Sequence, residues 1–391
     1  SSDIASDLMR LPKNSLKAVG FEKNENVLPE HPQAHPAYRL LQEYFFLPEK
    51  FFFFDIQNIP PKRAKETFDL FIPLSRSSST LSHQLALQSN SLLLGCSPII
   101  NLFSRNTEPV LIDQKRVEYN LIGNIREEKN TEIYSVSEVI GSDPKKGNVY
   151  KFSPYFSFSY PDTQDNQTFY WFTRRVPTRV SNQKGTDIKI SFVDLNLNIQ
   201  TPTNNIVYAK TLCSNRGLAS FINPNTPMHA TSSLPTKSIL CLNQPTQAVY
   251  PDLGGATLWR LVSQLNLNYL SLSSNTLSLQ TFQDVLRLYN AGHADGNERL
   301  IYGIADMQCE RAMRRFRPEA WRGFVMGTAI KLTFRPILYE TNTAALFSKV
   351  LSEFFSLYTH INTFTELSIQ KEDQKGYWKT WPTIAGVKQP L

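Results

Sequence analysis

The feature that most constrains this chain is an aromatic segment at residues 38–55, which reads YRLLQEYFFLPEKFFFFD. Eight of its residues are aromatic and three more are leucine. The first half is predicted to be a helix that ends at Pro48, and the phenylalanine run after it is predicted to be a strand buried on both faces. So much aromatic surface must be covered by the rest of the fold or by a partner subunit. The segment therefore indicates a role in protein assembly and not in catalysis.

Bulk composition favours a folded, β-rich protein of more than one domain. The chain has 391 residues, of which 41% are hydrophobic and 12% aromatic, and this length allows two or three separate cores. Its net charge of +7 is too dilute to indicate nucleic-acid binding. The four cysteines are far apart in the sequence, which is typical of a reducing compartment. We find no signal-peptide pattern and no apolar stretch of about 20 residues that would span a membrane.

The pattern of apolar residues predicts an α+β, β-rich multidomain fold. Residues 1–37 are predicted to be an extended lead-in. Residues 38–232 are predicted to form a β-rich domain with antiparallel strands, because apolar and polar residues alternate, as at Ile188, Ile190 and Phe192. Residues 233–391 are predicted to form an α+β domain, in which 346–358 has the strongest helical stripe and Leu367 and Ile369 lie on a strand. The apolar block at 91–103 fits either a short buried helix or a buried strand.

Several segments, in a fixed order, resemble one protein family. They are YRLLQEYFFLPEKFFFFD (38–55), LLLGCSPIINLFSRNTEPVLID (92–113), YSVSEVIG (134–141), LWRLVSQLNLNYLSL (258–272), AWRGFVMGT (320–328) and VLSEFFSLYTHINTFTEL (350–367). Together they resemble the TssF family, also called VasA or ImpG, of the bacterial type VI secretion system. Members of the family carry a further N-terminal region, so the chain looks like the larger C-terminal part of such a protein.

The resemblance implies a cytosolic, structural baseplate subunit that is docked at the inner-membrane complex. Two copies of the family member pair with one TssG to form a wedge that joins TssK and surrounds the VgrG spike. The baseplate primes assembly of the Hcp tube and of the TssB–TssC sheath, with TssE at the sheath end. No cofactor, nucleic acid or small-molecule substrate is expected.

The sequence gives no recognisable catalytic or metal site. His31 and His35 are four residues apart, but each precedes a proline, which disfavours the helix that would bring them onto one face. There is no HExxH motif, no GxSxG elbow and no GxxxxGK[ST] phosphate loop. We therefore predict no catalytic, metal-binding or cofactor-binding residues and no enzymatic activity.

The candidate interface residues are aromatic and arginine side chains of the types that anchor protein interfaces. They are Tyr38, Arg39, Glu43, Tyr44, Trp259, Arg260, Arg314, Arg315, Trp321 and Arg322. The arginines near residue 314 form the densest basic cluster, which could grip an acidic face of a neighbouring subunit or phosphates. Equally, these arginines could be solvated or stack on Trp321, and either tryptophan could belong to the core.

Two other classes of function stay open at this point. A β-rich module that binds ligands such as glycans would use surface aromatics, for instance Tyr155, Tyr160 and Tyr170. A hydrolase would need carboxylates that are distant in the sequence to converge in space.

Overall fold

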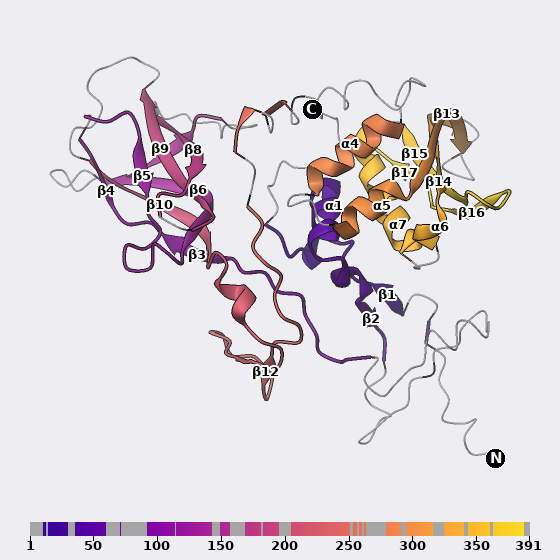
Figure 1. Ribbon diagram of the computed structural model, residues 1–391, viewed down its shortest axis with the longest axis horizontal. Coiled ribbons are helices and arrows are strands. Elements are labelled where there is room, and N and C mark those ends of the chain that lie inside the picture. Colours follow the sequence, from indigo (N-terminus) through magenta and orange to yellow (C-terminus); the bar gives the residue numbers. More distant parts are fainter. Residues whose placement is uncertain are drawn as a thin grey trace. The chain divides into compact units, whose positions relative to one another are not determined.

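The computed structural model describes residues 11–12, 15–29, 36–59, 71, 92–113, 115–142, 149–156, 169–180, 183–194, 205–250, 253–255, 258–259, 262, 279–290, 295–315, 324–339, 343–359 and 363–386. The chain divides into two compact units (Figure 1). Unit 1 combines residues 1–100 with 303–391, and unit 2 consists of residues 101–302. The predicted α+β, β-rich class is confirmed.

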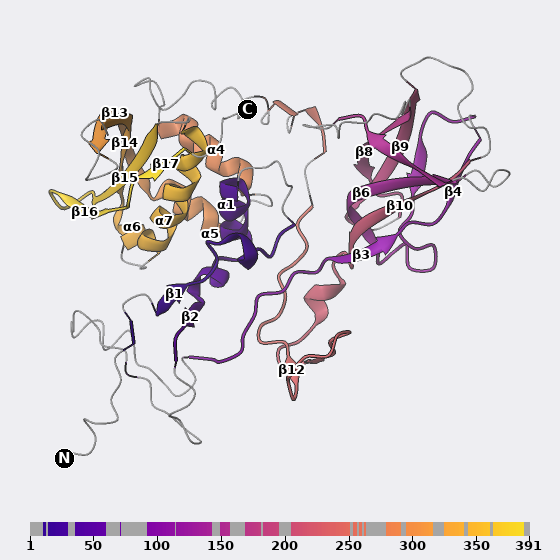
Figure 2. The same cartoon turned by 180° about the vertical axis from the view of Figure 1, so that it is seen from behind.

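Unit 2 is built on a curled sheet of eight strands, in which β6 and β10 lie side by side (Figure 2). The strand order is β3-β10-β6-β7-β8-β9-β5, and β4 also pairs with β10. All pairs are antiparallel except the short parallel pair of β7 and β8. The strands are β3 Phe103–Asn106, β4 Val110–Ile112, β5 Tyr119–Leu121, β6 Glu132–Ser142, β7 Val149–Pro154, β8 Phe169–Pro177, β9 Thr186–Asp194 and β10 Asn205–Ser214.

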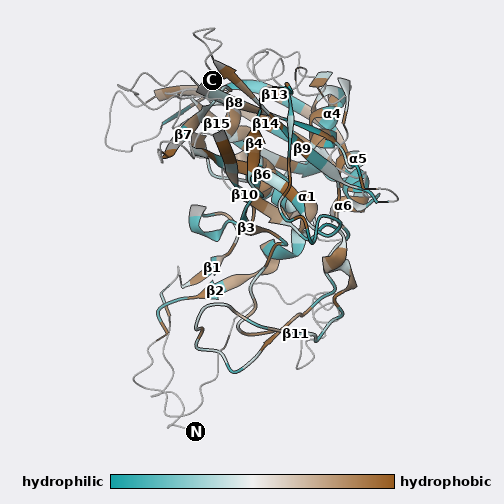
Figure 3. Cartoon of the chain, turned by 90° about the vertical axis from the view of Figure 1, so that its left-hand side faces the viewer, coloured by the Kyte–Doolittle hydropathy of each residue, from teal (hydrophilic) through white to brown (hydrophobic). Residues whose placement is uncertain are grey.

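Alternating apolar side chains form the core of unit 2, as the sequence predicted. In β9, Ile188 and Ile190 are almost fully buried and pack with Val139 of β6 and Val207 of β10. The strands of the chain accordingly mix apolar and polar residues along their length (Figure 3). Smaller elements follow the sheet: η3 Leu218–Phe221, β11 Pro227–Met228, β12 Ile239–Leu240, and the helices α4 Leu279–Tyr289 and α5 Asp295–Tyr302.

The C-terminal part of unit 1 is a mixed sheet with helix α7 (Ala344–Phe355) packed on it. The other elements are β13 Ile304–Arg315, β14 Phe324–Phe334, α6 Pro336–Tyr339, η4 Ser356–Tyr358, β15 Phe364–Lys371, β16 Tyr377–Thr380 and β17 Ile384–Ala385. Strand β14 is antiparallel to β13 and parallel to β15, and the helical connection between the parallel strands contains α7. The predicted stripe is confirmed, because Phe347, Leu351 and Phe354 of α7 are fully buried.

The N-terminal part of unit 1 packs the rings of Tyr44 and Phe45 on α7. Its elements are β1 Leu16–Ala18, η1 Lys23–Glu25, α1 Pro36–Phe46, η2 Pro48–Phe52 and β2 Phe54–Ile56. The ring of Tyr44 on α1 stacks on Phe347 of α7, with centroids 5.6 Å apart and planes at 13°. Segments about 300 residues apart in the sequence therefore share one core.

Two predictions of local structure are wrong. The phenylalanine run is a 3-10 helix followed by a three-residue strand, and Phe52 and Phe54 are exposed, so it is not a strand buried on both faces. Residues 92–100 form neither a buried helix nor a buried strand. The sequence also predicts a helical apolar stripe at 258–265 and an alternating strand pattern at 156–160, and both lie mostly outside the described residues. The division into domains 1–37, 38–232 and 233–391 stays a prediction.

Candidate functional site

A buried ion cluster centred on Glu43 fixes the N-terminal segment of unit 1. The Glu43 carboxylate accepts hydrogen bonds from the backbone N–H groups of Val27 and Leu28, each at 2.9 Å. It also forms ion pairs with Lys50 and with Arg39, the latter at 3.4 Å. Burial lowers the pKa of Lys50, and the contact with Glu43 opposes that effect. The cluster holds a loop, α1 and η2 together, which is a structural role.

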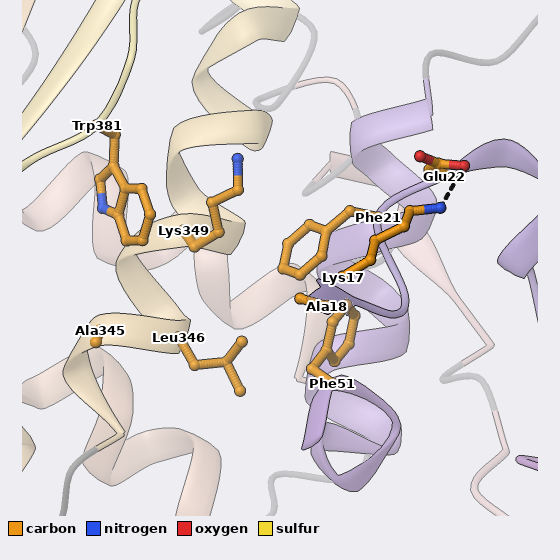
Figure 4. Close-up of a pocket in the computed structure, with 9 residues that line it drawn as sticks. All are labelled: Lys17, Ala18, Phe21, Glu22, Phe51, Ala345, Leu346, Lys349 and Trp381. Carbon is orange, nitrogen blue, oxygen red and sulfur yellow. Dashed lines mark ion pairs between the residues drawn. The ribbon is translucent and has the colours of Figure 1, made fainter. Parts of the chain in front are cut away.

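Beside this cluster, unit 1 has an open, mainly apolar pocket of about 460 Å³ (Figure 4). Phe21 and Phe51 line one side of it, and Leu346, Lys349 and Trp381 line the other. The Lys349 ammonium lies 5.5 Å from the centre of the Phe21 ring and 5.6 Å from that of Trp381. It is also paired with Glu353. Such a lining is typical of a pocket that binds an apolar group.

The paired strands β13 and β14 carry a second exposed apolar surface at their outer end. Met313 of β13 lies directly opposite Met326 of β14, and Arg315 lies opposite Phe324. Met313, Met326 and Phe324 are 55%, 50% and 63% exposed. Of the predicted basic cluster, Arg311 and Arg315 alternate with Met313 along β13 and share its face, whereas Arg314 lies on the opposite face.

A third apolar surface is the segment 92–100, which reads LLLGCSPII. Leu94 is fully exposed, and Leu92, Leu93 and Ile99 are each more than half exposed. An exposed run of this kind is unusual in a monomer and is typical of a binding surface.

Buried ionic contacts in unit 2 cross-link the strands of the curled sheet. Glu132 at the start of β6 accepts hydrogen bonds from the Thr186 backbone N–H (3.0 Å) and from the Thr186 hydroxyl. The Arg216 guanidinium lies 3.6 Å from Glu132 and 3.4 Å from Asp187. Since Gly185 has a φ of +145° and faces the Arg216 side chain closely, a larger residue there would collide with it. We assign these contacts to stability.

The described residues contain no arrangement that suggests catalysis. Within the described ranges, no three His, Cys, Asp or Glu side chains come together in a way that would hold a metal ion. Burial raises the pKa of the Cys309 thiol to about 11 and also raises that of Cys213, whereas a reactive thiol needs a lowered pKa. Near β7 and β8 the Tyr155 ring packs edge to face against Phe156 and Tyr170, and Phe156 is largely exposed, so the glycan-binding alternative stays a prediction.

None of the described helices has the length and apolar character needed to cross a bilayer.

The structure places the predicted interface residues in separate parts of the chain. Arg39, Glu43 and Tyr44 are buried within unit 1, and Tyr38 is half-buried next to them. Trp259 is 72% exposed. Arg314 is paired with Glu366 at 2.6 Å, and Arg315 is exposed on the same strand. Arg260, Trp321 and Arg322 lie outside the described residues. That any of them contacts a partner stays a prediction.

The sequence analysis missed two features of these candidate sites. Lys50 was not linked to Glu43, because the helix break at Pro48 hides that the two side chains meet. The exposed methionines were missed too, although the spacing of Arg311, Met313 and Arg315 is the signal of one strand face.

Comparison with known proteins gives consistent results. The family model described as "Type VI secretion system, TssF" matches residues 2–388. The chain is 27% identical to the Type VI secretion system component TssF1 of Pseudomonas aeruginosa over 98% of its own length and 64% of that relative's. Its fold is similar to a chain in the cryo-electron microscopy structure of the TssK-TssF-TssG baseplate subcomplex, with a TM-score of 0.68, 22% identity, and coverage of 96% of this chain and 68% of that one. A chain in the baseplate complex of the type VI secretion system gives a TM-score of 0.54 at 19% identity, over 88% of this chain and 58% of that one.

Proposed function

Because the chain belongs to the TssF family of the type VI secretion system, we propose that it is a structural subunit of the baseplate and works through protein interfaces, not catalysis. The observation that carries the proposal is the family match, which runs through almost the whole chain. The exposed apolar segment at 92–100 supports it, because permanent assemblies cover such surfaces.

The proposed neighbours follow from the family. TssK and TssG are named with TssF in the solved subcomplex. We propose that two copies of this protein pair with one TssG to form a wedge around the VgrG spike, and that the wedge joins TssK. The ring of wedges would prime the Hcp tube and the TssB–TssC sheath, with TssE at the sheath end. We place the assembly in the bacterial cytosol, docked on the inner-membrane complex.

The test is coexpression of the chain with TssG and TssK, followed by native mass measurement of the purified complex. We expect a complex that contains two copies of this chain for each TssG. A monodisperse monomer that elutes apart from both partners would overturn the proposal. A calorimetric titration with glycans checks the alternative of a glycan-binding module, and we expect no heat of binding.

A further inference from the structure

The charged residues that line the pocket of unit 1 are already paired. Lys17 lies 2.7 Å from Glu22, and Lys349 lies 2.6 Å from Glu353 (Figure 4). These pairs account for the three charged residues among the nine that line the pocket. A charged ligand would have to displace one of these partners, whereas an uncharged apolar group would leave both pairs intact. The pocket therefore fits an uncharged, apolar occupant.

The apolar part of the lining encloses room for more than one side chain. Phe21 and Phe51 lie across the pocket from Leu346 and Trp381 (Figure 4), and the volume between them is about 460 Å³. Pockets of this size enclose ligands larger than a single side chain. A loop with neighbouring apolar residues would therefore fill it better than one isolated side chain.

The apolar segment 92–100 of the same chain has matching properties. It contains no charged residue and begins with three consecutive leucines. The side chain of Leu94 is fully exposed, and those of Leu92 and Leu93 are each more than half exposed. Gly95 has a φ of +71°, so the backbone bends directly after Leu94. Leu94 thus lies at a bend of an exposed apolar loop, where it can enter a pocket.

We propose that the segment 92–100 of one copy inserts Leu94 into the pocket of a second copy, and that the second copy does the same in return. Among the described residues, none of 92–100 lines the pocket of its own chain. An apolar segment and a complementary pocket that are separate on one molecule make a contact between molecules. A reciprocal exchange closes this contact into a symmetric pair and covers both apolar surfaces. The inference goes beyond the proposed function, because it names the surfaces through which two copies touch and needs no other subunit.

The test measures self-association of the complete purified chain by sedimentation velocity, and we expect the wild type to form a dimer. Leu94→Ser removes the inserted side chain, and Ala18→Trp fills the pocket from an exposed position. Each change should weaken the dimer about tenfold or more. The control Leu111→Ser makes the same change at an exposed leucine of unit 2 and should leave the dimer unchanged. Because the altered side chains are all exposed, the unfolding temperatures should match the wild type.

A mixture of the two variants tests whether the segment and the pocket touch each other. A pair of identical variants lacks both contacts, because either both segments or both pockets are altered. A mixed pair keeps one contact, in which Leu94 of the Ala18→Trp copy enters the intact pocket of the Leu94→Ser copy. The mixture should therefore associate more tightly than either variant alone.

Several results would overturn the inference. They are a monomeric wild type, a dimer that neither variant weakens, and a mixture that associates no more tightly than its components. A photo-crosslinking amino acid at position 94 identifies the occupant in a mixture of unlabelled and isotope-labelled chains. We expect crosslinks between peptides of different label, whereas crosslinks only within one label would place the segment in the pocket of its own chain. In the complex coexpressed with TssG and TssK, a crosslink from position 94 to either subunit would replace the second copy as occupant. If the dimer forms as expected but no complex with TssG and TssK is recovered, the inference stands and the proposed function fails.

Discussion

The buried carboxylate of Glu43 offers the sharpest test of what stabilises unit 1. Glu43→Gln keeps the shape of the side chain and an oxygen for the N–H groups of Val27 and Leu28, but it removes the charge that faces Lys50 and Arg39. Those two cations are 1% and 7% exposed, so the variant leaves positive charge buried without a counter-ion. Breaking a buried pair in this way costs roughly 3–5 kcal/mol.

Weaker hydrogen bonds add to this loss. Replacing a charged acceptor by a neutral one weakens each of the two N–H bonds by about 1 kcal/mol. Lys50 can partly offset the cost by losing its proton or by reaching water. We therefore expect the free energy of unfolding of unit 1 to fall by about 4 kcal/mol.

Hydrogen exchange followed by mass spectrometry is the suitable assay, because a chain of two units need not unfold in one transition. Amides in residues 15–29 and 36–59 should exchange up to about a thousandfold faster in Glu43→Gln. Glu49→Gln is the matched control, since it makes the same change on an exposed residue of η2. Adding Lys50→Met to Glu43→Gln should restore part of the protection, because it removes a stranded charge.

The reasoning is refuted if Glu43→Gln exchanges within about tenfold of Glu49→Gln, or if adding Lys50→Met lowers protection further. Either result would mean that the charges contribute little and that the aromatic packing on α7 suffices.

Two further predictions concern close packing and surface charge. Gly327→Ala would place a methyl group 2.4 Å from the ring and the carbonyl oxygen of Phe364, so thermal unfolding should show a loss of about 1–3 kcal/mol, whereas Gly296→Ala, which points into open space, should cost nothing measurable. Hydrogen bonds from Lys151 and Lys210 lower the pKa of Glu138 to about 2, so its contribution to stability is present above the ordinary value of 4.5 and is lost as the pH falls through 2. Nuclear magnetic resonance titration should show this pKa rising towards 4.5 in Lys151→Met, and an unchanged value would contradict the assignment.

The spacing of apolar residues in the sequence correctly predicted those elements in which buried residues recur at regular intervals. Ile188 and Ile190 alternate, and Phe347, Leu351 and Phe354 follow the helical spacing, so the strand and the helix were both found from the sequence. The prediction of a buried strand for the phenylalanine run failed because the residues of the run are all apolar. The spacing of apolar residues cannot then distinguish a strand from the tight 3-10 turn that Pro48 starts. Residues 92–100 failed for a related reason, since an apolar run reads as buried whether this chain or a partner covers it.

The buried ion pairs and the candidate surfaces could not be predicted, because they arise from contacts between residues that are distant or separated by a turn in the sequence. Glu132 and Arg216 meet across 84 residues, and Glu43 meets Lys50 only because the chain turns back after α1. The exposed pair of Met313 and Met326 became visible only from the register of β13 and β14. By contrast, the family resemblance was carried by whole segments, and so it did not depend on these details.

The sharing of one core by α1 and α7 has a consequence for biosynthesis. After Tyr44 has emerged from the ribosome, about 300 more residues must be synthesised before Phe347 emerges. This takes roughly 15–60 s at ordinary elongation rates. During that interval unit 2 can complete its sheet, since all its strands lie within residues 101–302. During this interval the apolar face of α1 is not yet covered by α7. The nascent chain is therefore a natural substrate for a chaperone.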